Sequence, residues 1–274
     1  MQIKNHLLIK DDGNAVTFKA TPNKGGSLTP QYLVMHYTAA TTAGSAISWF
    51  LNPNAQASAH LLIDRDGSIT QFAPFNVITW HAGKSQWQGL SGLNKYSIGI
   101  ELVNGGRLTK SGNKWICPVD HRTIPIDEVI IARHKNDSTE SGWQEYTEKQ
   151  LEAAMNVAAL LVKKYNLKDV VGHEDIAPIR KSDPGPAFPM LSFRSKAMGR
   201  NDKSSGEVKN SVELNIRTGA ASSFPTLTKA LPVGTHMLVL RTEGTWSFVE
   251  VLQSVHGIMD LEGWVSTKYL IAAQ

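Results

Sequence analysis

The chain has little of several features that would place it in a special class of protein. It contains one cysteine, Cys117, so no disulfide can form within the chain, and its stability must come from packed cores or a bound metal. No apolar run approaches the roughly 18–20 residues that a membrane-spanning helix needs. Lysine and arginine do not cluster in a run, and we find no nucleic-acid-binding motif. These absences exclude a disulfide scaffold and a membrane span, and they argue against nucleic acid as the main partner.

What the chain does have is an ordinary globular composition. Hydrophobic residues make up 41% of it and charged residues 19%, as in proteins with packed cores. The formal net charge of +4 is mildly basic and favours anionic partners such as teichoic acids or acidic glycans. At 274 residues the chain is long enough for two domains. We expect it to be a monomer.

One segment, residues 170–189, concentrates residue types that bind metal ions. It contains His173, Asp183 and four prolines, and a helix does not tolerate that proline density. We therefore predict a rigid loop, which is a common place for ligands. A third ligand is expected from His36, where an apolar run ends. Two histidines, one carboxylate and an open position for water make a catalytic zinc site, so these three residues are our candidates to hold one zinc ion per chain.

Each candidate also has a simpler interpretation. A single histidine after an apolar run is more often a hydrogen-bonded core residue, and Asp183 could merely cap the turn before Pro184-Gly185. Glu101 lies within a predicted buried strand, residues 98–102, where an unpaired charge is costly. Glu101 is therefore either a carboxylate paired with a structural cation or a general base.

Seven motifs that include these residues occur in one order along the chain. They are Val34-Met35-His36-Tyr37-Thr38, Ser58-Ala59-His60, Ile63-Asp64-Arg65-Asp66-Gly67, Trp80-His81-Ala82-Gly83, Tyr96-Ser97-Ile98-Gly99-Ile100-Glu101-Leu102, Gly172-His173-Glu174-Asp175-Ile176-Ala177-Pro178 and Lys181-Ser182-Asp183-Pro184-Gly185-Pro186. With these motifs, roughly the first 195 residues resemble the zinc-dependent N-acetylmuramoyl-L-alanine amidases of the AmpD type. That family is similar to the peptidoglycan recognition proteins and some phage lysozymes.

The resemblance implies a fold and an activity. The expected fold is an α/β domain at residues 1–198, with a mixed central sheet flanked by helices. The expected reaction is hydrolysis of the amide between the lactyl group of N-acetylmuramic acid and L-alanine, in peptidoglycan or muropeptides. The catalytic acidic residue of the family falls on Glu101. Lys181, which alone would suggest a solvated loop cation, then becomes a candidate to stabilise the oxyanion of the tetrahedral intermediate.

Four further residues are candidates to line a substrate groove. Trp80 and His81 offer an apolar face and a hydrogen-bonding tip to sugar or peptide. Tyr37 directly follows a predicted ligand, and His60 ends the Ser-Ala-His motif. His60 could instead be a structural histidine that forms a hydrogen bond to a metal ligand without binding the metal itself.

Local signals indicate the elements that carry these residues. Thr147 to Gln150 reads as a capping box that starts a helix reaching about Tyr165. Thr41 or Thr42 is expected to cap an earlier helix, and Asp66-Gly67 is expected to turn a hairpin. Residues 103–146 read as an irregular insertion near the active-site rim, with a short strand or helical turn at 129–132.

The pattern of apolar residues changes in the rest of the chain. Residues 199–210 contain no apolar cluster and read as a linker. Residues 211–274 consist of short alternating runs separated by turns, which predicts a small all-β barrel. The runs around Leu214-Asn215-Ile216-Arg217 and Glu262-Gly263-Trp264-Val265 resemble a bacterial Src-homology-3-like domain, and in related hydrolases such modules bind the cell wall.

Two other functions are compatible with parts of the sequence. Wall peptidases with a cysteine–histidine pair also carry such barrels, but Trp115-Ile116-Cys117-Pro118 lacks the electropositive setting that activates a thiol. A module that binds muropeptide without cutting it is the second alternative. Against it, all three predicted zinc ligands are present.

The sequence also gives an expectation about location. Met1-Gln2-Ile3-Lys4-Asn5-His6 leads into a short apolar patch and then two aspartates, without the features of a secretory signal. We therefore expect a bacterial or phage protein that is made in the cytoplasm. It would act on the wall after non-classical delivery, or on cytosolic muropeptides.

Overall fold

The computed structural model describes residues 1–199, 207–258 and 261–273, and it contains two compact units. The first unit comprises Met1–Ile130 and Ser141–Phe188, and the second comprises Ile131–Glu140 and Pro189–Gln274. Most of the predicted linker, residues 200–206, lies outside the described residues. Its last residues form strand β18 (Glu207–Asn210), so the sheet of the second unit begins before the predicted boundary at residue 211.

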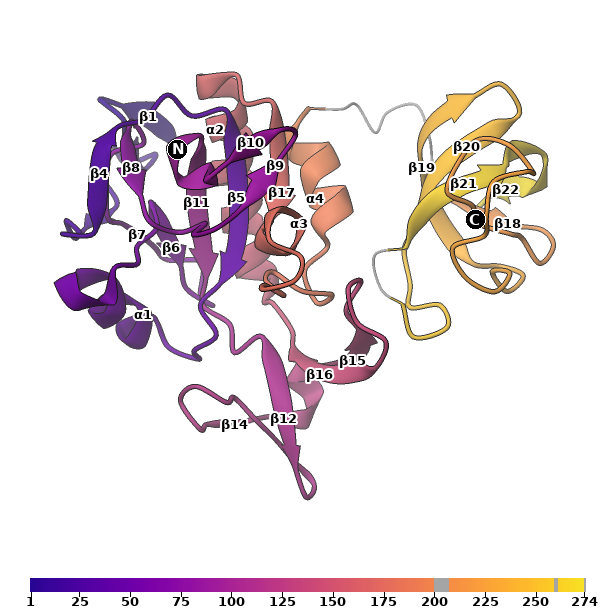
Figure 1. The fold of residues 1–274 in the computed structure, drawn as a ribbon, viewed down its shortest axis with the longest axis horizontal. Helices are drawn as coiled ribbons and strands as arrows, with labels where there is room; N and C mark the ends of the chain where they lie inside the picture. Colours follow the sequence, from indigo (N-terminus) through magenta and orange to yellow (C-terminus); the bar gives the residue numbers. More distant parts are fainter. Residues whose placement is uncertain (200–206, 259–260, 274) are drawn as a thin grey trace. The chain divides into compact units, whose positions relative to one another are not determined.

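The first unit is built on a mixed six-stranded sheet (Figure 1). Its strands, in spatial order, are β17 (Asp169–Gly172), β5 (Tyr32–Tyr37), β11 (Ser97–Leu102), β6 (Leu61–Ile63), β7 (Ile69–Gln71) and β3 (Thr17–Phe18). Neighbouring strands from β17 to β6 run parallel, whereas β6 and β7 form the antiparallel hairpin predicted around Asp66-Gly67. The expectation of an α/β fold with a mixed sheet is confirmed.

The two central strands place the predicted site residues on one face. Strands β5 and β11 are nearly continuous apolar runs, as expected where both faces of a parallel sheet are covered. Successive side chains alternate between faces, so Val34 and His36 point to the side opposite Leu33 and Met35. The register pairs Glu101 with His36. These two side chains therefore lie next to each other, near the carboxyl ends of their strands.

Helix α2 (Glu148–Tyr165) covers one face of this sheet, behind β5 (Figure 1). As predicted, Thr147 caps it: its Oγ1 accepts a hydrogen bond from the Gln150 amide at 3.2 Å. The second half of the predicted capping box is absent. The Gln150 side chain instead donates to the carbonyls of Ile63 and Val103, both at 3.0 Å, and so ties the helix to the sheet.

Shorter elements surround the sheet. Helix α1 (Ala43–Leu51) is capped by Thr42 as predicted, and its Phe50 ring packs edge-on against Phe72, with centroids 5.3 Å apart. The other elements are β1 (Gln2–Lys4), β2 (Leu7–Ile9), β4 (Lys24–Ser27), β8 (Val77–Thr79), β9 (Gln86–Trp87) and β10 (Leu90–Ser91). Within the described ranges, no helix has the length and hydropathy to cross a membrane.

Two segments are more ordered than the sequence predicts. The predicted loop at residues 170–189 begins as the end of strand β17 and continues as one helical turn, α3 (His173–Ile176), before the proline-rich part starts. The insertion at 103–146 is not an irregular loop, because it forms a five-stranded sheet. Its strands, in spatial order, are β14 (Thr123–Ile124), β13 (Lys114–Ile116), β12 (Arg107–Ser111), β16 (Glu140–Gln144) and β15 (Val129–Arg133).

The second unit is rich in β-structure and has its own core. Its antiparallel sheet has the order β21 (Glu262–Ser266), β20 (Trp246–Val251), β19 (His236–Glu243), β18 (Glu207–Asn210) and β22 (Leu270–Ala272). The buried residues that pack together include Leu214, Ile216, Leu231, Met237, Val249 and Val265. Helix α4 (Met190–Ala197) also belongs to this unit.

The Gln150 contacts generate a prediction about stability. Replacing Gln150 by Leu removes the side-chain donor from the Val103 carbonyl, and an unsatisfied buried carbonyl costs about 1–3 kcal/mol. We expect the free energy of unfolding, measured by chemical denaturation, to fall by about that amount. Lys149→Ala, at an exposed position beside it, is the matched control and should change stability by less than about 0.5 kcal/mol. Equal effects in the two variants would show that the bridge contributes nothing.

Candidate metal centre and cleft

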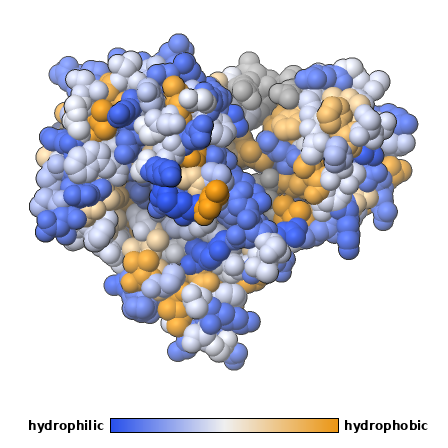
Figure 2. Space-filling view, in the orientation of Figure 1, coloured by the Kyte–Doolittle hydropathy of each residue, from blue (hydrophilic) through white to orange (hydrophobic). Residues whose placement is uncertain are grey.

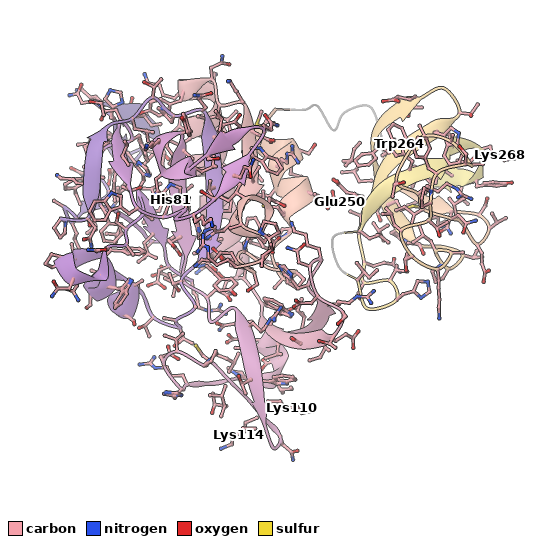
Figure 3. The ribbon with its side chains drawn as sticks, in the orientation of Figure 1. His81, Lys110, Lys114, Glu250, Trp264 and Lys268 are labelled. Carbon is pink, nitrogen blue, oxygen red and sulfur yellow. The ribbon has the colours of Figure 1, made fainter. Side chains whose placement is uncertain are left out.

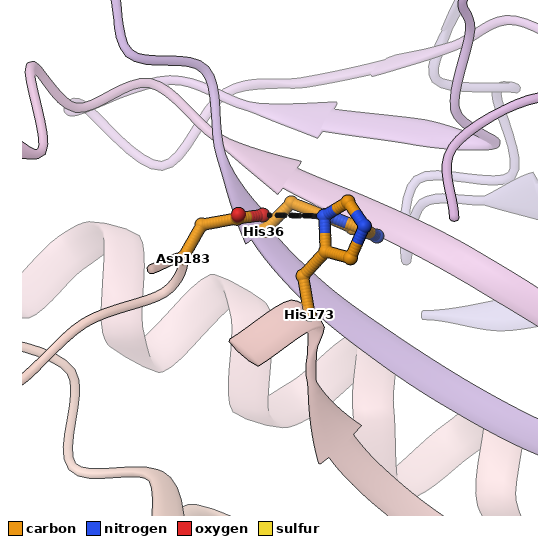
Figure 4. Close-up of side chains that lie close together, drawn as sticks. All are labelled: His36, His173 and Asp183. Carbon is orange, nitrogen blue, oxygen red and sulfur yellow. Dashed lines mark hydrogen bonds and ion pairs between the residues drawn. The ribbon is translucent and has the colours of Figure 1, made fainter. Parts of the chain in front are cut away.

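The fold brings His36, His173 and Asp183 together (Figure 4). His36 lies at the end of β5, and His173 follows the neighbouring parallel strand β17, so the two carboxyl ends meet. The Nδ1 atoms of the two histidines are 2.9 Å apart, and each lies 2.9 Å from Asp183 Oδ2. All three side chains are buried. Three potential ligand atoms therefore converge on one point.

The surroundings leave these atoms with lone pairs facing each other. His173 Nε2 lies 3.1 Å from the Ala82 carbonyl, which can only accept, so Nε2 carries the proton and Nδ1 does not. Burial is the main cause that lowers the pKa of His36, to about 4. Burial alone would raise the pKa of Asp183, but the two histidines outweigh it and hold that pKa below the usual range. Such a cluster of acceptors is repulsive unless it holds a cation.

Glu101 is the titratable group next to this cluster. Its Oε2 is buried and has no hydrogen-bond partner in the described part of the chain. Burial, reinforced by the negative charge of Asp183, raises the pKa of Glu101 well above its ordinary value, while Lys181 acts in the opposite direction. The unpaired oxygen favours a role in proton transfer over the alternative of a structural ion pair.

The cluster opens into a cleft of about 790 Å³. Glu101, Lys181, Tyr37, Trp80 and His81 line it, so most of the residues predicted for the active site and groove face the same space. On the displayed face of the first unit, hydrophobic residues are scattered among hydrophilic ones (Figure 2). A ligand with both polar and apolar parts suits such a cleft.

His60, which we predicted among the groove residues, does not line this cleft. It is fully buried. Its Nε2 donates to the Val77 carbonyl at 2.8 Å, and its Nδ1 accepts from the Thr79 hydroxyl and the Gly99 amide. Every polar atom of its ring is thus satisfied within the protein, and the structural interpretation of His60 applies.

The structure also adds cleft residues that the sequence did not indicate. Trp49, on α1, and Val119, from the insertion, line the cleft with 55% and 59% of their surfaces exposed. Arg180 also lines the cleft, and its guanidinium donates to the carbonyls of Ala82 and Lys84 at 2.9 and 3.0 Å. Single exposed hydrophobic side chains are common on protein surfaces, so the sequence carried no clear signal for these residues.

Cys117 has no place in this site. Its side chain is fully buried, and its Sγ donates to the Ala39 carbonyl at 3.3 Å. Burial raises the pKa of the thiol, which disfavours the reactive thiolate. Since it does not line the cleft, the structure argues against a cysteine nucleophile.

Comparison with known proteins agrees with this geometry. Residues 26–186 match the family model described as N-acetylmuramoyl-L-alanine amidase, which is more than half of the chain. The chain belongs to this family. The matched range contains His36, Glu101, His173, Lys181 and Asp183, together with the insertion, whereas the described part of the C-terminal sheet lies beyond it.

Two of the relatives in the amidase family are proteins of Escherichia coli. The chain is 36% identical to 1,6-anhydro-N-acetylmuramyl-L-alanine amidase AmpD over 141 residues, which are 51% of this chain and 57% of that protein. It is 31% identical to N-acetylmuramoyl-L-alanine amidase AmiD over 176 residues, which are 61% of this chain and 53% of that protein. The chain thus spans a little more than half the length of these curated relatives.

A solved structure supports the fold. The crystal structure of a selenomethionine AmpD derivative aligns with a TM-score of 0.50 and 26% sequence identity, covering 72% of this chain and 99% of that chain. The α/β unit therefore has the architecture of this family.

Proposed function

We propose that this protein is a zinc-dependent amidase that hydrolyses the bond between the lactyl group of N-acetylmuramic acid and L-alanine. The observation that carries the proposal is the triangle of His36, His173 and Asp183 at the base of a cleft, with the unpaired Glu101 carboxyl beside it. Membership of the amidase family supports it. The name of the E. coli relative AmpD, an anhydro-N-acetylmuramyl-L-alanine amidase, indicates the class of substrate.

The donor set fits zinc better than other common ions. Two imidazole nitrogens and one carboxylate oxygen are typical of catalytic zinc, whereas calcium and magnesium prefer oxygen ligands. Zinc bonds to nitrogen and oxygen are about 2.0–2.2 Å long, so ligand atoms 2.9 Å apart are close enough to share one ion. When bound, zinc supplies Lewis acidity, which polarises a carbonyl group and makes water more acidic.

Glu101 is the residue placed to move the proton. Its raised pKa suits a group that accepts a proton from the attacking water and returns it to the leaving nitrogen of L-alanine. The protonated Glu101 side chain is then the acid that completes cleavage of the amide bond.

Lys181 is the cation placed to meet developing negative charge. It lines the cleft, and its positive charge acts to lower the pKa of both His36 and Glu101, which supports a place near the centre. An ammonium group held there stabilises the oxyanion of the tetrahedral intermediate more than it stabilises the neutral amide.

We further propose that the second unit is a Src-homology-3-like module that binds polymeric cell wall. Its five-stranded sheet has a separate core, and aromatic residues line its strands: the rings of Phe248 and Trp264 lie 5.3 Å apart (Trp264 in Figure 3). A soluble fragment needs no second anchor, so this unit favours the intact wall as substrate. Action on the wall would require the protein to leave the cytoplasm.

Metal analysis tests the first proposal. We expect about one zinc ion per purified chain, and loss of that zinc in His36→Ala, His173→Ala and Asp183→Ala, because each variant removes one of three ligands. His121→Asn, an exposed histidine outside the cleft, is the control and should keep its zinc. Full metal retention in all three ligand variants would refute the assignment.

Two substitutions separate catalysis from structure. Glu101→Gln keeps the shape of the side chain but cannot accept a proton, so we expect kcat on muropeptide to fall by about 10²–10⁴-fold. Lys181→Met should lower kcat by about 10²–10³-fold. Both should retain zinc and melt near the wild-type temperature. A Glu101→Gln protein that is unstable yet turns over normally per zinc-loaded molecule would mean that Glu101 is structural.

The same preparations decide between an amidase and a non-catalytic binding module. Wild-type protein should release L-alanine-terminated peptides from muropeptide, and a chelator should stop this release. A protein that binds muropeptide, with or without zinc, and yields no such peptide under any condition would be a recognition module instead.

Truncation tests the role of the second unit. A chain that ends at residue 199 should turn over soluble muropeptide at nearly the wild-type rate, because every predicted catalytic residue precedes that point. It should bind purified sacculi more weakly, since a tether raises the effective concentration at a polymer. Equal losses on both substrates would show that the second unit is needed for the active site itself.

A further inference from the structure

His81 makes a contact that its predicted place in the groove does not explain (labelled in Figure 3). Its side chain is 8% exposed, and its Nδ1 lies 3.0 Å from His36 Nε2, the nitrogen that points away from the metal centre. On the other side of the ring, Nε2 lies 3.2 Å from the Ser97 carbonyl and 3.3 Å from the Ser97 hydroxyl. His81 therefore connects the backbone of β11 to a predicted metal ligand.

The direction of these hydrogen bonds follows from the Ser97 carbonyl. A carbonyl can only accept, so His81 Nε2 carries a proton and donates it. The Ser97 hydroxyl donates to the Leu93 carbonyl at 2.6 Å and so can only accept from His81 as well. In a neutral ring with its proton on Nε2, Nδ1 is an acceptor. His36 Nε2 must then be the donor, which leaves His36 Nδ1 without a proton and facing the centre.

The backbone around His81 fixes the position of its ring. Asn94 Oδ1 accepts hydrogen bonds from the amides of His81 and Ala82, at 3.0 and 2.7 Å. Beneath the ring lies Gly99, where a Cβ atom would be 2.5 Å from His81 Cγ. Glycine is needed at this position to make room for the imidazole. The ring is thus held from both the backbone and the sheet side.

We propose that His81 is a positioning residue that sets the tautomer and orientation of His36. Metal-bound histidines usually donate their second nitrogen to a carboxylate, a backbone carbonyl or water. Here the acceptor is the neutral imidazole of His81. His81 in turn donates its own proton to the Ser97 carbonyl, which holds the ring in place. As a link to a metal ligand, this inference rests on the zinc centre of the proposed function, but its tautomer assignment does not require the metal.

Nuclear magnetic resonance tests the assignment on the wild-type chain. In protein labelled with ¹⁵N-histidine, long-range ¹H–¹⁵N correlations should show His81 with its proton on Nε2. Protonation of His81 on Nδ1 would reverse the direction of the hydrogen bond and overturn the proposal. This measurement depends neither on a variant that folds nor on activity.

Zinc affinity, measured by competition with a chelator, tests the consequence. His81→Phe keeps a ring but removes the acceptor for His36, and loss of such an outer partner typically weakens metal binding about 10–100-fold. His81→Asn retains an acceptor oxygen near the position of Nδ1 and should bind zinc more tightly than His81→Phe. The proposal would be overturned if folded His81→Phe protein bound zinc as tightly as the wild-type protein does.

A glycine pair provides a matched control that leaves every histidine in place. Gly99→Ala should displace the His81 ring and weaken zinc binding in the same direction as His81→Phe. Gly26→Ala, where an added Cβ meets nothing within 4 Å, should leave zinc affinity unchanged. Unchanged affinity in a folded Gly99→Ala protein would contradict the role of the ring. Failure of the wild-type chain to bind zinc would instead refute the proposed function.

Discussion

Three electron-rich atoms held 2.9 Å apart in a buried place are the constraint on which the site depends. Such atoms repel one another in the absence of a proton or metal ion, and burial removes the water that would screen the repulsion. The sheet must therefore hold them in place. The neighbouring parallel strands β5 and β17 end at the same edge of the sheet, which places the two histidines beside each other. The free energy of folding of the whole unit offsets the repulsion between the acceptor atoms.

The same constraint gives each neighbouring residue a distinct task. The outer nitrogen of His173 is bonded to a backbone carbonyl, and that of His36 to another imidazole. Glu101, one strand away, has no partner for its buried Oε2 within the described residues. The centre thus combines fully bonded side chains, which fix geometry, with one unbonded carboxyl oxygen, which remains available for chemistry. The proposed reaction needs a rigid site for the ion and a group that can gain and lose a proton. The division between bonded and unbonded side chains suits both needs.

The sequence allowed the prediction of the converging residues because their types suit a metal site and because seven ordered motifs resemble one family. A histidine at the end of an apolar strand, a carboxylate inside another and a histidine–aspartate pair in a proline-rich segment are all recognisable without a structure. Hydrogen-bond direction is not recognisable in this way. The link from Ser97 through His81 to His36 depends on a three-dimensional contact, so the sequence predicts the place of His81 in the cleft but not this second contact. The burial of His60 away from the cleft likewise depends on contacts that the sequence does not display.

The errors in the fold have equally physical origins. In the insertion, the last three residues of β12 are all exposed. This strand therefore lacks the alternation of apolar and polar residues that identifies a strand in a sequence. The pattern from Thr147 to Gln150 was right about the start of α2 but not about the glutamine side chain, because strand carbonyls lie within its reach. Local patterns determine where an element begins, whereas tertiary neighbours decide which hydrogen bonds form.

The pairing of β11 with β5 carries a consequence for the length of β11. Glu101 stands opposite His36 and Gly99 opposite Val34 in a parallel register. Because side chains alternate between faces, deleting one residue from β11 would turn both positions towards the opposite side of the sheet at once. The Glu101 side chain and the space for the His81 ring would be lost together from the face that carries the metal centre. The length of β11 is therefore tied to the geometry of the centre in this chain.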